Sequence, residues 1–531
     1  MMKCRQCQEA IKVTGCTKSG VCGKSPEVAG AQDMLVQSLM VLSMGTFDKE
    51  LPAAVVEDID RRVVDGLFMT LTNTNFDLDV IKDAFRRNKD LKTEYDIACP
   101  PVDGGACDCM SLASKVGIDS FDANEDLRSL KELLLTGLKG LAAYYHHAVI
   151  LGYEDASIPA FLRKGLAAIR RNHTAEELVA LNMECGAVGV TCMALLDKAN
   201  TETYGTPEIT QVSTAVGDRP GILITGHDLK DLHMLLEQTK GTGIDVYTHG
   251  EMLPANAYPA FKAYDNLKGN YGGAWHLQKQ EFDSFNGPVL VTTNCIQIPD
   301  AGYRDRIFTT GVAGATGVKH IDADADGNKD FSELVSMAKG CKPPTLLDDH
   351  NLVIGLAHAT VLSLADKIVD AVKNGDITRF VVMAGCDGRE KSREYYTQFA
   401  KELPSSTVIL TAGCAKYRYN KLDLGDIGGI PRVVDAGQCN DCYSLVVIAS
   451  KLAEVFGTDV NGLPLSFNIS WYEQKACLVL LALLHLGVKD IMLGPRLPVF
   501  LTPGVTQVLV DTFGIKPNSD VESDMRILHI K

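Results

Sequence analysis

The sequence lacks any uninterrupted apolar run of about 18 residues, the length of a helix that spans a bilayer. Its start, Met1–Cys7, also lacks the apolar core of a signal peptide. Positive charge is in deficit, with 52 Lys and Arg against 67 Asp and Glu and a formal net charge of −15. This balance opposes attraction to nucleic acids and to anionic membranes, which bind basic surfaces. We therefore expect a cytoplasmic protein that has neither a nucleic acid nor a membrane as a partner.

The common nucleotide-binding motifs are also missing. No Gly-x-Gly-x-x-Gly follows an expected strand, and no phosphate loop of the Walker type is found. We therefore do not expect the chain to take electrons from NADH by itself. What the sequence does have is an ordinary globular composition, 46% hydrophobic and 22% charged, which excludes disordered, collagen-like and coiled-coil proteins. Its 531 residues allow three or four domains of about 150 residues each.

The first part of the chain has the periodicity of helices. Within 127–141, leucines recur at three- and four-residue spacing, as they do on one buried helix face. The expected helical blocks are 27–45, 50–70, 76–89, 125–151, 155–172 and 174–199. The sequence therefore predicts an all-helical domain of bundle type, which we assign to residues 1–216 together with the Cys-rich start.

The pattern changes after a stretch of turn formers between positions 200 and 220. Short β-branched runs now alternate with amphipathic helical stretches, which is typical of parallel βαβ units. The expected strands are 221–225, 244–248, 288–293, 380–384, 408–412, 432–435, 467–471 and 491–493. A polar, Pro-containing stretch at 342–350 divides them. We expect a multidomain protein in which two Rossmann-like α/β domains with largely parallel sheets, 217–350 and 351–531, follow the helical domain.

Sixteen cysteines are the most informative residues. In a cytoplasmic chain they are expected to be thiols or metal ligands, because the cytosol keeps thiols reduced. Four of them, Cys4, Cys7, Cys16 and Cys22, form the pattern Cys-x2-Cys-x8-Cys-x5-Cys. Four soft thiolates this close suit a tetrahedral zinc or an iron–sulfur cluster. A zinc ribbon usually has two Cys-x2-Cys pairs, so the stretched second pair favours a cubane cluster. Zinc, and thiols that bind nothing, remain alternatives.

A second set of candidate ligands follows the expected strands. Each of seven strands runs into a side chain that can bind a metal: His227, Glu251, Cys295, Cys386, Cys414, Cys439 and Glu473. The carboxyl ends of strands in an open α/β sheet lie along one edge, where ligands bind at switch points. Taken singly, each has a simpler explanation, because a cysteine there is often a small buried apolar residue and His227 could cap a helix.

Together the seven are hard to explain as packing. Four thiolates and two carboxylates carry six negative charges when ionised, and such charge is not buried without cations. Thiolates prefer soft metals, whereas carboxylate and imidazole bring harder iron character. The mixed set therefore predicts several irons bridged by both sulfur and oxygen, some with open positions at which a small oxygen- or nitrogen-containing substrate is reduced.

These residues resemble the hybrid cluster protein family, also called prismane proteins or hydroxylamine reductases. The resemblance covers essentially the whole chain and is specific, because the seven strand-end residues occur in the family's order. It rests on motifs such as Gly226-His227-Asp228, His249-Gly250-Glu251, Gly385-Cys386-Asp387 and Trp471-Tyr472-Glu473. The intact helical region resembles the form with a full-length first domain. A likeness to carbon monoxide dehydrogenase is also implied, without that enzyme's nickel site.

The resemblance implies cofactors. Cys4, Cys7, Cys16 and Cys22 would hold a [4Fe–4S] cluster. His227, Glu251, Cys295, Cys386, Cys414, Cys439 and Glu473 would hold a hybrid [4Fe–2S–2O] cluster, with a persulfide on Cys386. Electrons would come from a redox partner protein, such as an iron–sulfur flavoprotein, through the N-terminal cluster.

The implied reaction is the two-electron cleavage of hydroxylamine to ammonia and water. Lys475 is our candidate for the proton donor, since a strand would place it on one face with Glu473; an ammonium on a solvated helix start is the alternative. Glu251, Glu473 and His227 could also relay protons. Two other functions stay open: reduction of nitric oxide to nitrous oxide at the same site, and a non-enzymatic sensor of nitrosative stress that transfers a modification from Cys386.

The remaining cysteines and one histidine pair are interpreted as structural. Cys442 is expected to pack inward from a helix. The other cysteines given this interpretation are Cys99, Cys107, Cys109, Cys185, Cys192, Cys341 and Cys477. Neighbours on a helix diverge by about 100°, so His146-His147 is expected to pack rather than to bind a metal.

Overall fold

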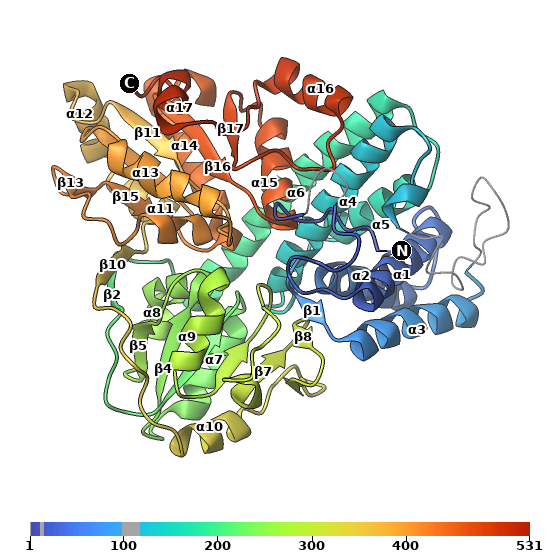
Figure 1. Cartoon of the computed structure of the whole chain (residues 1–531). Coiled ribbons are helices and arrows are strands. Elements are labelled where there is room, and N and C mark those ends of the chain that lie inside the picture. The colour runs from blue at the N-terminus through green and yellow to red at the C-terminus, as the bar shows by residue number, and fades with distance from the viewer. Residues whose placement is uncertain (1, 11–14, 98–116) are drawn as a thin grey trace.

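The computed structural model describes residues 2–10, 15–97 and 117–531 (Figure 1). Its N-terminal part is helical, as predicted, and each of the six expected blocks corresponds to one helix. These helices are α1 (Pro26–Thr46), α2 (Ala53–Met69), α3 (Leu78–Glu94), α4 (Glu125–Val149), α5 (Ser157–Ile169) and α6 (Ala175–Tyr204). Their starts follow from local chemistry, because the side chains of Ser25, Asp77, Asn124 and Thr174 each accept hydrogen bonds from backbone N–H groups of the first turn.

The first α/β region contains a six-stranded sheet in which every pairing is parallel. Its spatial order is β5 (Leu267–Asn270), β4 (Asp245–His249), β3 (Gly221–Thr225), β6 (Val289–Val291), β7 (Ile307–Thr310) and β9 (Lys319–Ile321). The helices of this region are α7 (Leu229–Thr239), α8 (Pro259–Lys262), α9 (Gln278–Ser284) and α10 (Ser332–Lys339). Three of these strands, β3, β4 and β6, were expected; β5, β7 and β9 were not.

The second α/β region contains a five-stranded sheet, again wholly parallel. Its order is β15 (Val433–Asp435), β12 (Thr407–Thr411), β11 (Arg379–Val382), β16 (Leu465–Ser470) and β17 (Ile491–Gly494), and all five strands were expected. The helices of this region are α11 (His358–Ser363), α12 (Ala365–Asn374), α13 (Glu394–Glu402), α14 (Tyr443–Phe456), α15 (Gln474–His485), α16 (Pro503–Phe513) and α17 (Val521–Ile527). The fold class is therefore the predicted one, a helical part followed by two Rossmann-like parts.

Small strand pairs connect the regions. β2 (Thr210–Ser213) pairs antiparallel with β10 (Asn351–Ile354), so the segments on either side of the first sheet region lie together. β1 (Asn75–Phe76) of the helical part pairs with β8 (Gly314–Ala315) of the first α/β region. A further pair, β13 (Asp426–Ile427) with β14 (Ile430–Pro431), lies within the second α/β region. The exact domain limits at 216 and 350 stay a prediction.

The helical part and the second α/β part share a core. α15, although it follows β16, packs along α4 and α6 at the centre of the molecule (Figure 1). The approach is close, because a Cβ added to Gly186 of α6 would lie 2.2 Å from the backbone oxygen of Leu481 in α15. α15 carries Lys475 in its first turn and Glu473 at its N-cap, so this packing brings both residues to the place where the three parts meet.

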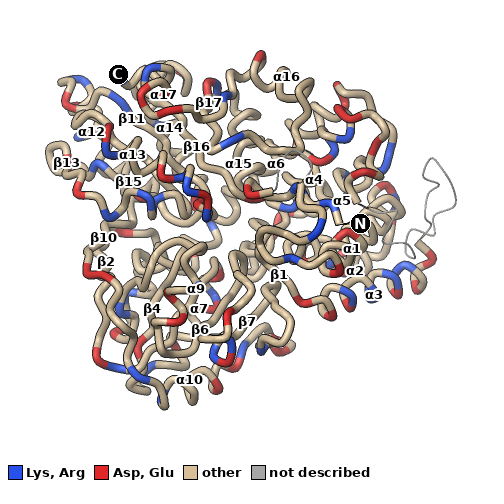
Figure 2. The backbone as a smooth tube through the Cα atoms, in the orientation of Figure 1, with Lys and Arg blue, Asp and Glu red and all other residues tan. Residues whose placement is uncertain are grey.

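Two features bear on the prediction that nucleic acids and membranes are not partners: the distribution of charged residues and the apolar helix α6. Figure 2 shows Lys and Arg interspersed with Asp and Glu along α3 and around the edge of the molecule. Within the described ranges, α6 alone is long and apolar enough to cross a membrane by length and composition, a test that buried core helices also pass. α6 packs against α4 and α15.

Candidate metal centre

The seven residues predicted to bind a metal line one cavity. Its walls are formed by His227, Glu251, Cys295, Cys386, Cys414, Cys439 and Glu473, together with Trp275, Asn294, Gly385, Tyr472 and Lys475. Residues separated by up to 246 positions thus meet where the carboxyl ends of both parallel sheets face each other. The convergence expected from the strand ends is present.

The topology explains why they meet. The chain leaves β3 for β4 on one side and returns to pair β6 on the other, so β3 and β6 flank the switch point of the first sheet. His227 and Cys295 follow these two strands. β11 and β16 flank the switch point of the second sheet, and Cys386 and Glu473 follow them. A loop at a switch point opens a crevice at the carboxyl edge, and each sheet contributes its crevice to the same cavity.

His227, Glu251 and Cys439 form the tightest group of donors. The Nε2 atom of His227 lies 3.3 Å from the Cys439 Sγ and 3.8 Å from the Glu251 Oε2, and the three donor atoms all lie within 4.8 Å of one another. The Nδ1 atom of His227 is 3.0 Å from the backbone oxygen of Asn294, which can only accept, so Nδ1–H donates. That hydrogen bond leaves Nε2 unprotonated and able to act as a ligand atom, the usual arrangement for a metal-binding imidazole.

Burial favours the neutral form of the cavity thiols when no metal is bound. Burial raises the pKa of the Cys295 thiol to about 12, with a further contribution from Glu473. Burial likewise raises the pKa values of Cys386, Cys414 and Cys439. A metal ion reverses this preference, because a coordinated thiol is deprotonated outright.

Donor chemistry fits an iron cluster with mixed ligands. The Oε1 atom of Glu251 is buried with no hydrogen-bond partner, although its Oε2 accepts from the Cys439 backbone N–H at 2.6 Å. An unpaired buried carboxylate oxygen is costly unless something binds it. Soft thiolates, hard carboxylates and an imidazole around one cavity suit irons bridged by sulfur and oxygen.

Lys475 is the ammonium that lines this cavity. It is 1% exposed, and its Nζ lies 3.1 Å from the His227 Nε2 and 3.4 Å from the Asn294 Oδ1. The alternative that it stands on a solvated helix start is wrong. Our reason for placing it beside Glu473 is also corrected: the two residues are not on a strand, because Glu473 is the N-cap of α15 and its carboxylate accepts from the Lys475 backbone N–H at 3.0 Å. The helix turn, rather than strand alternation, positions Lys475.

The four N-terminal thiols gather in a loop beside the cavity. Cys4 and Cys16 exchange backbone hydrogen bonds of 3.1 and 2.9 Å. Burial, with the nearby Cys4 and Cys22 thiols, raises the pKa of Cys7 well above its usual value. Cys7 packs in one apolar cluster with Trp275, Cys414 and Tyr472, so this loop contacts the walls of the seven-residue cavity directly.

Aromatic residues lie between the two groups of thiols. The rings of Trp275 and Tyr472 are 4.9 Å apart between centroids, and Tyr472 accepts a backbone hydrogen bond of 2.9 Å from Gln8 of the N-terminal loop. Neither aromatic residue was a predicted site residue, and strand-end spacing gives no signal for Trp275, which lies in a 3-10 turn.

Arg393 is another residue that the sequence did not reveal. It is fully buried, and its guanidinium donates to Gln8 Oε1 at 2.7 Å, to the Trp471 carbonyl at 2.8 Å and to Ser470 Oγ at 2.7 Å. It thereby ties the N-terminal loop to the end of β16. In the sequence, Arg393 stands among Lys391, Ser392 and Glu394 and has the pattern of a solvated helix start.

The residues interpreted as structural are accounted for as follows. The Nδ1 atom of His146 lies 2.8 Å from Asp65, and His147 is buried against Phe68, as expected for packing. Cys442 is 7% exposed and faces an apolar cavity. Cys185, Cys192 and Cys477 are buried, whereas Cys341 is partly exposed. Cys99, Cys107 and Cys109 lie outside the described residues.

Gly385 has to be a glycine for Cys386 to reach the cavity. Its φ is +109°, and an added Cβ would lie 2.1 Å from the Ser470 carbonyl oxygen. Gly375 has a similar positive φ of +80° but open space around the added Cβ. We expect Gly375→Ala to cost about 1–2 kcal/mol of unfolding free energy, and Gly385→Ala to cost about 1–3 kcal/mol more because of the clash. Urea unfolding of both variants tests this; equal costs would show that the contact with Ser470 relaxes freely.

Comparison with known proteins shows the family to which the chain belongs. It matches the Prismane/CO dehydrogenase family over residues 2–526. It is 58% identical to a hydroxylamine reductase of Methanosarcina mazei, over 99% of this chain and 100% of that protein. It is 56% identical to a hydroxylamine reductase of Thermoanaerobacter pseudethanolicus, over 99% of both chains.

Solved structures show the same architecture at low identity. Carbon monoxide dehydrogenase from Thermococcus sp. AM4 superposes with a TM-score of 0.58 at 17% identity, over 100% of this chain and 90% of that one. Carbon monoxide dehydrogenase IV from Carboxydothermus hydrogenoformans gives 0.57 at 15% identity, over 100% and 92%. The expected likeness to carbon monoxide dehydrogenase is therefore present in the fold.

Proposed function

We propose that this chain, which belongs to the Prismane/CO dehydrogenase family, is an iron–sulfur oxidoreductase that reduces hydroxylamine to ammonia and water. The reaction takes up two electrons and two protons for each N–O bond broken. The observation that carries the proposal is the cavity itself, where seven donors of mixed hardness and one buried ammonium meet. Full-length relatives that bear the name hydroxylamine reductase support it.

The cavity residues would hold the hybrid [4Fe–2S–2O] cluster. His227, Glu251, Cys295, Cys386, Cys414, Cys439 and Glu473 are its proposed ligands. When bound, the cluster supplies electrons and Lewis acidity toward the nitrogen and oxygen of the substrate.

The chain's own residues supply the protons. Lys475 is our proposed donor to the departing hydroxyl, because its Nζ enters the cavity 3.1 Å from the His227 Nε2. The thiolates and carboxylates around it keep the ammonium protonated: Cys439 and Glu473 raise the pKa of Lys475, against the effect of burial. The Glu473 carboxylate accepts a hydrogen bond from the Lys475 backbone N–H and so positions the donor.

Electrons are proposed to enter through the N-terminal thiols. Cys4, Cys7, Cys16 and Cys22 would hold a [4Fe–4S] cluster and receive electrons from a redox partner protein. The packing of Cys7 against Trp275 and Tyr472 supports a short route from that cluster to the cavity. Lys24, buried beside these thiols, offers a positive charge that offsets theirs.

Iron content and product analysis test the proposal together. We expect about eight irons per chain, four from each cluster, and one ammonia for every two electrons consumed with hydroxylamine. Zinc at the N-terminal thiols with no iron elsewhere would contradict it. Nitric oxide is the competing substrate, with two molecules joined to nitrous oxide and water by two electrons and two protons. A much higher kcat/KM for nitric oxide than for hydroxylamine, with the same reductant, would replace our assignment.

A paired substitution separates the enzyme from a sensor. If Cys386 serves only to transfer a modification to other proteins, Cys386→Ser abolishes that transfer and Glu473→Gln spares it. If both residues bind the cluster, the two variants lose hydroxylamine reduction together. We expect the second result, measured as ammonia formed by each variant at matched iron content.

A further inference from the structure

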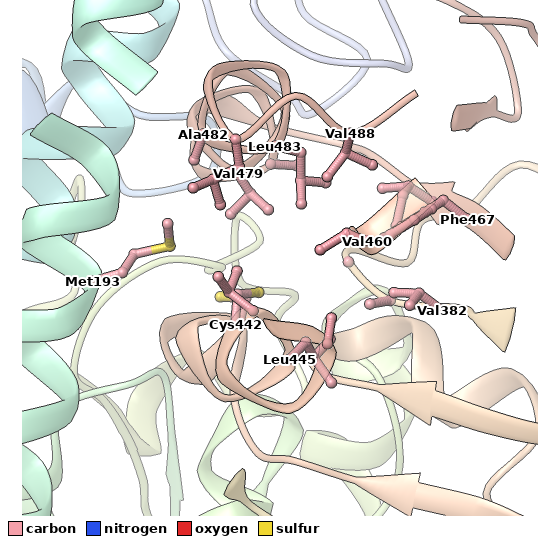
Figure 3. Close-up of a pocket in the computed structure, with 18 of the residues that line it drawn as sticks. Met193, Val382, Cys442, Leu445, Val460, Phe467, Val479, Ala482, Leu483 and Val488 are labelled. Atoms are coloured by element: carbon pink, nitrogen blue, oxygen red, sulfur yellow. The ribbon is translucent and has the colours of Figure 1, made fainter. Parts of the chain in front are cut away.

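A small polar cavity, of about 40 Å³, lies beside the N-terminal thiols. It is lined by residues of the N-terminal loop, α1 and α4, among them Cys4, Lys24, Asp33 and Lys139. The described lining of the cavity between α14 and α15 includes no Lys, Arg, Asp or Glu (Figure 3). The cavity at Cys4 is, in contrast, surrounded by charged side chains.

Most of these charges are positive. The cavity is lined by two carboxylates, Asp33 and Glu132, and by four cationic side chains, Lys3, Arg5, Lys24 and Lys139. Arg5 pairs with Glu132, and its Nε lies 3.3 Å from that carboxylate. Lys3 pairs with Asp119 at 2.5 Å. The other two cations, Lys24 and Lys139, remain as a local excess of positive charge in a chain whose net charge is −15.

Both of these ammonium groups are buried, and both are held by neutral groups. Lys139 is 4% exposed, and its Nζ donates to the Gln6 Oε1 at 2.8 Å and to the Thr70 carbonyl at 3.5 Å. The Nζ of Lys24 donates to the Gln32 Oε1 at 2.5 Å. In the part of the chain that the structure describes, neither ammonium has a carboxylate at ion-pair distance. Buried ammonium groups without a counter-charge are costly, so a negative group close by is needed to balance them.

The N-terminal thiols are suited to supply that negative charge. Gln6 joins the two sides, because its Oε1 accepts from Lys139 and its Nε2 lies 3.9 Å from the Cys4 Sγ. Burial, together with Lys24, lowers the pKa of Lys139, whereas Asp33 and Cys4 act in the opposite direction. Four thiolates around a cluster would add more negative charge on this side and keep the Lys139 ammonium protonated.

The same glutamine connects Lys139 with the start of α15. The Nε2 atom of Gln474 donates to the Gln6 Oε1 at 3.1 Å and to the Gln6 carbonyl at 3.2 Å. Gln474 stands between Glu473 and Lys475 in the chain. Because Gln6 contacts Cys4 itself, whereas Gln474 separates Lys139 from Glu473, the Lys139 charge is expected to act mainly on the N-terminal thiols.

We propose that Lys139 sets the reduction potential of the N-terminal cluster, by holding a positive charge beside Cys4 that favours the reduced form. The inference rests on the proposed function, because it concerns the cluster that the four thiols are proposed to hold. The step is the uptake of one electron from the redox partner protein. No bond forms or breaks, and the cluster gains one negative charge. A fixed positive charge stabilises this form more than the oxidised form, and net charge is one of the properties that set the potentials of iron–sulfur clusters.

A redox titration of the iron-loaded protein, followed by electron paramagnetic resonance of the reduced N-terminal cluster, tests the proposal. Two unit charges about 10 Å apart, at an effective dielectric constant of about 20, interact by more than the equivalent of a tenfold change in an equilibrium constant. Lys139→Met is therefore expected to disfavour reduction by about tenfold, which lowers the midpoint potential by about 59 mV for one electron. Lys139→Arg keeps the charge and is expected to keep the wild-type potential.

Lys131→Met is the matched control. Lys131 lies on the same helix and is 1% exposed, but it does not line the cavity, and its Nζ lies 2.9 Å from Asp122. This variant is expected to keep the wild-type potential of the N-terminal cluster.

Asp33→Asn tests the opposite sign. Burial raises the pKa of Asp33 to about 6, so at a pH above this value the carboxylate is mostly charged. Its removal is expected to raise the midpoint potential. This variant keeps both ammonium groups, and it decides the question if Lys139→Met does not fold or does not hold its iron.

The outcomes separate this inference from the proposed function. An unchanged potential in Lys139→Met with iron at the N-terminal thiols, or equal shifts in Lys139→Met and Lys139→Arg, would overturn the inference and leave the cluster assignment intact. No rise in Asp33→Asn would overturn it as well. Zinc instead of iron at these thiols in the wild-type protein would refute the proposed electron relay itself, and this result is obtained from metal analysis before any potential is measured.

Discussion

Replacing Lys475 by methionine is expected to lower the kcat of hydroxylamine reduction by about 10²–10⁴-fold, the usual contribution of a positioned proton donor. Methionine fills similar space but has no charge and no acidic proton to donate. Lys475 is 1% exposed and lines the cavity in which its ammonium approaches His227. Removal of the charge also takes away the ammonium that lines the cavity beside the thiols and carboxylates, so iron content has to be measured on the same preparation.

The control for Lys475 is a lysine outside the centre. Lys451 on α14 has a side chain 45% exposed and pairs with Glu454 of the same helix, so Lys451→Met is expected to keep full activity. A variant Lys475→Met that holds all its iron and turns over within threefold of wild type would remove Lys475 from the mechanism. Full loss of iron would instead make it a residue that stabilises the cluster.

The sequence predicted most of these helices and strands because the spacing of apolar residues reflects which side chains are buried. All six helices of the first part and all five strands of the second sheet follow from apolar periodicity and β-branched runs. Of the three strands of the first sheet that were not found, β7 does have that pattern, because it reads Ile-Phe-Thr-Thr and is buried. The other two lack it: β5 reads Leu-Lys-Gly-Asn, and β9 reads Lys-His-Ile with two exposed residues. Such strands form because they extend a sheet whose central strands are already buried.

The convergence of the seven candidate ligands could be predicted for a similar reason. Parallel strands end at one edge, so a side chain that follows a strand, such as His227 or Cys414, has its position fixed by topology. Arg393 and Trp275 could not be predicted, because their roles depend on the distance between the N-terminal loop and β16, which no local pattern encodes. The burial of Lys475 depends likewise on α15 packing between α4 and α6, from another part of the chain.

Arg393→Met is expected to lower the free energy of unfolding by about 3–5 kcal/mol, because it leaves several buried hydrogen-bonding groups without a partner. The groups that lose their partner are the Gln8 amide oxygen and the Trp471 carbonyl, whereas the Ser470 hydroxyl keeps its hydrogen bond to the Cys386 carbonyl. Since these contacts fasten the N-terminal loop to the end of β16, we expect the iron held by the N-terminal thiols to leave first on urea titration, before the iron at the cavity.

Arg86 on α3, whose side chain is 69% exposed, provides the control, and Arg86→Met is expected to change stability by less than about 0.5 kcal/mol. Both variants are compared by urea unfolding of the iron-loaded protein, with iron release followed by absorbance. Simultaneous release of all iron in Arg393→Met, or a cost no larger than that of Arg86→Met, would show that this guanidinium does not fasten the loop, which the hydrogen bonds from Arg496 to the Gln8 carbonyl and from Gln8 to the Tyr472 carbonyl also hold.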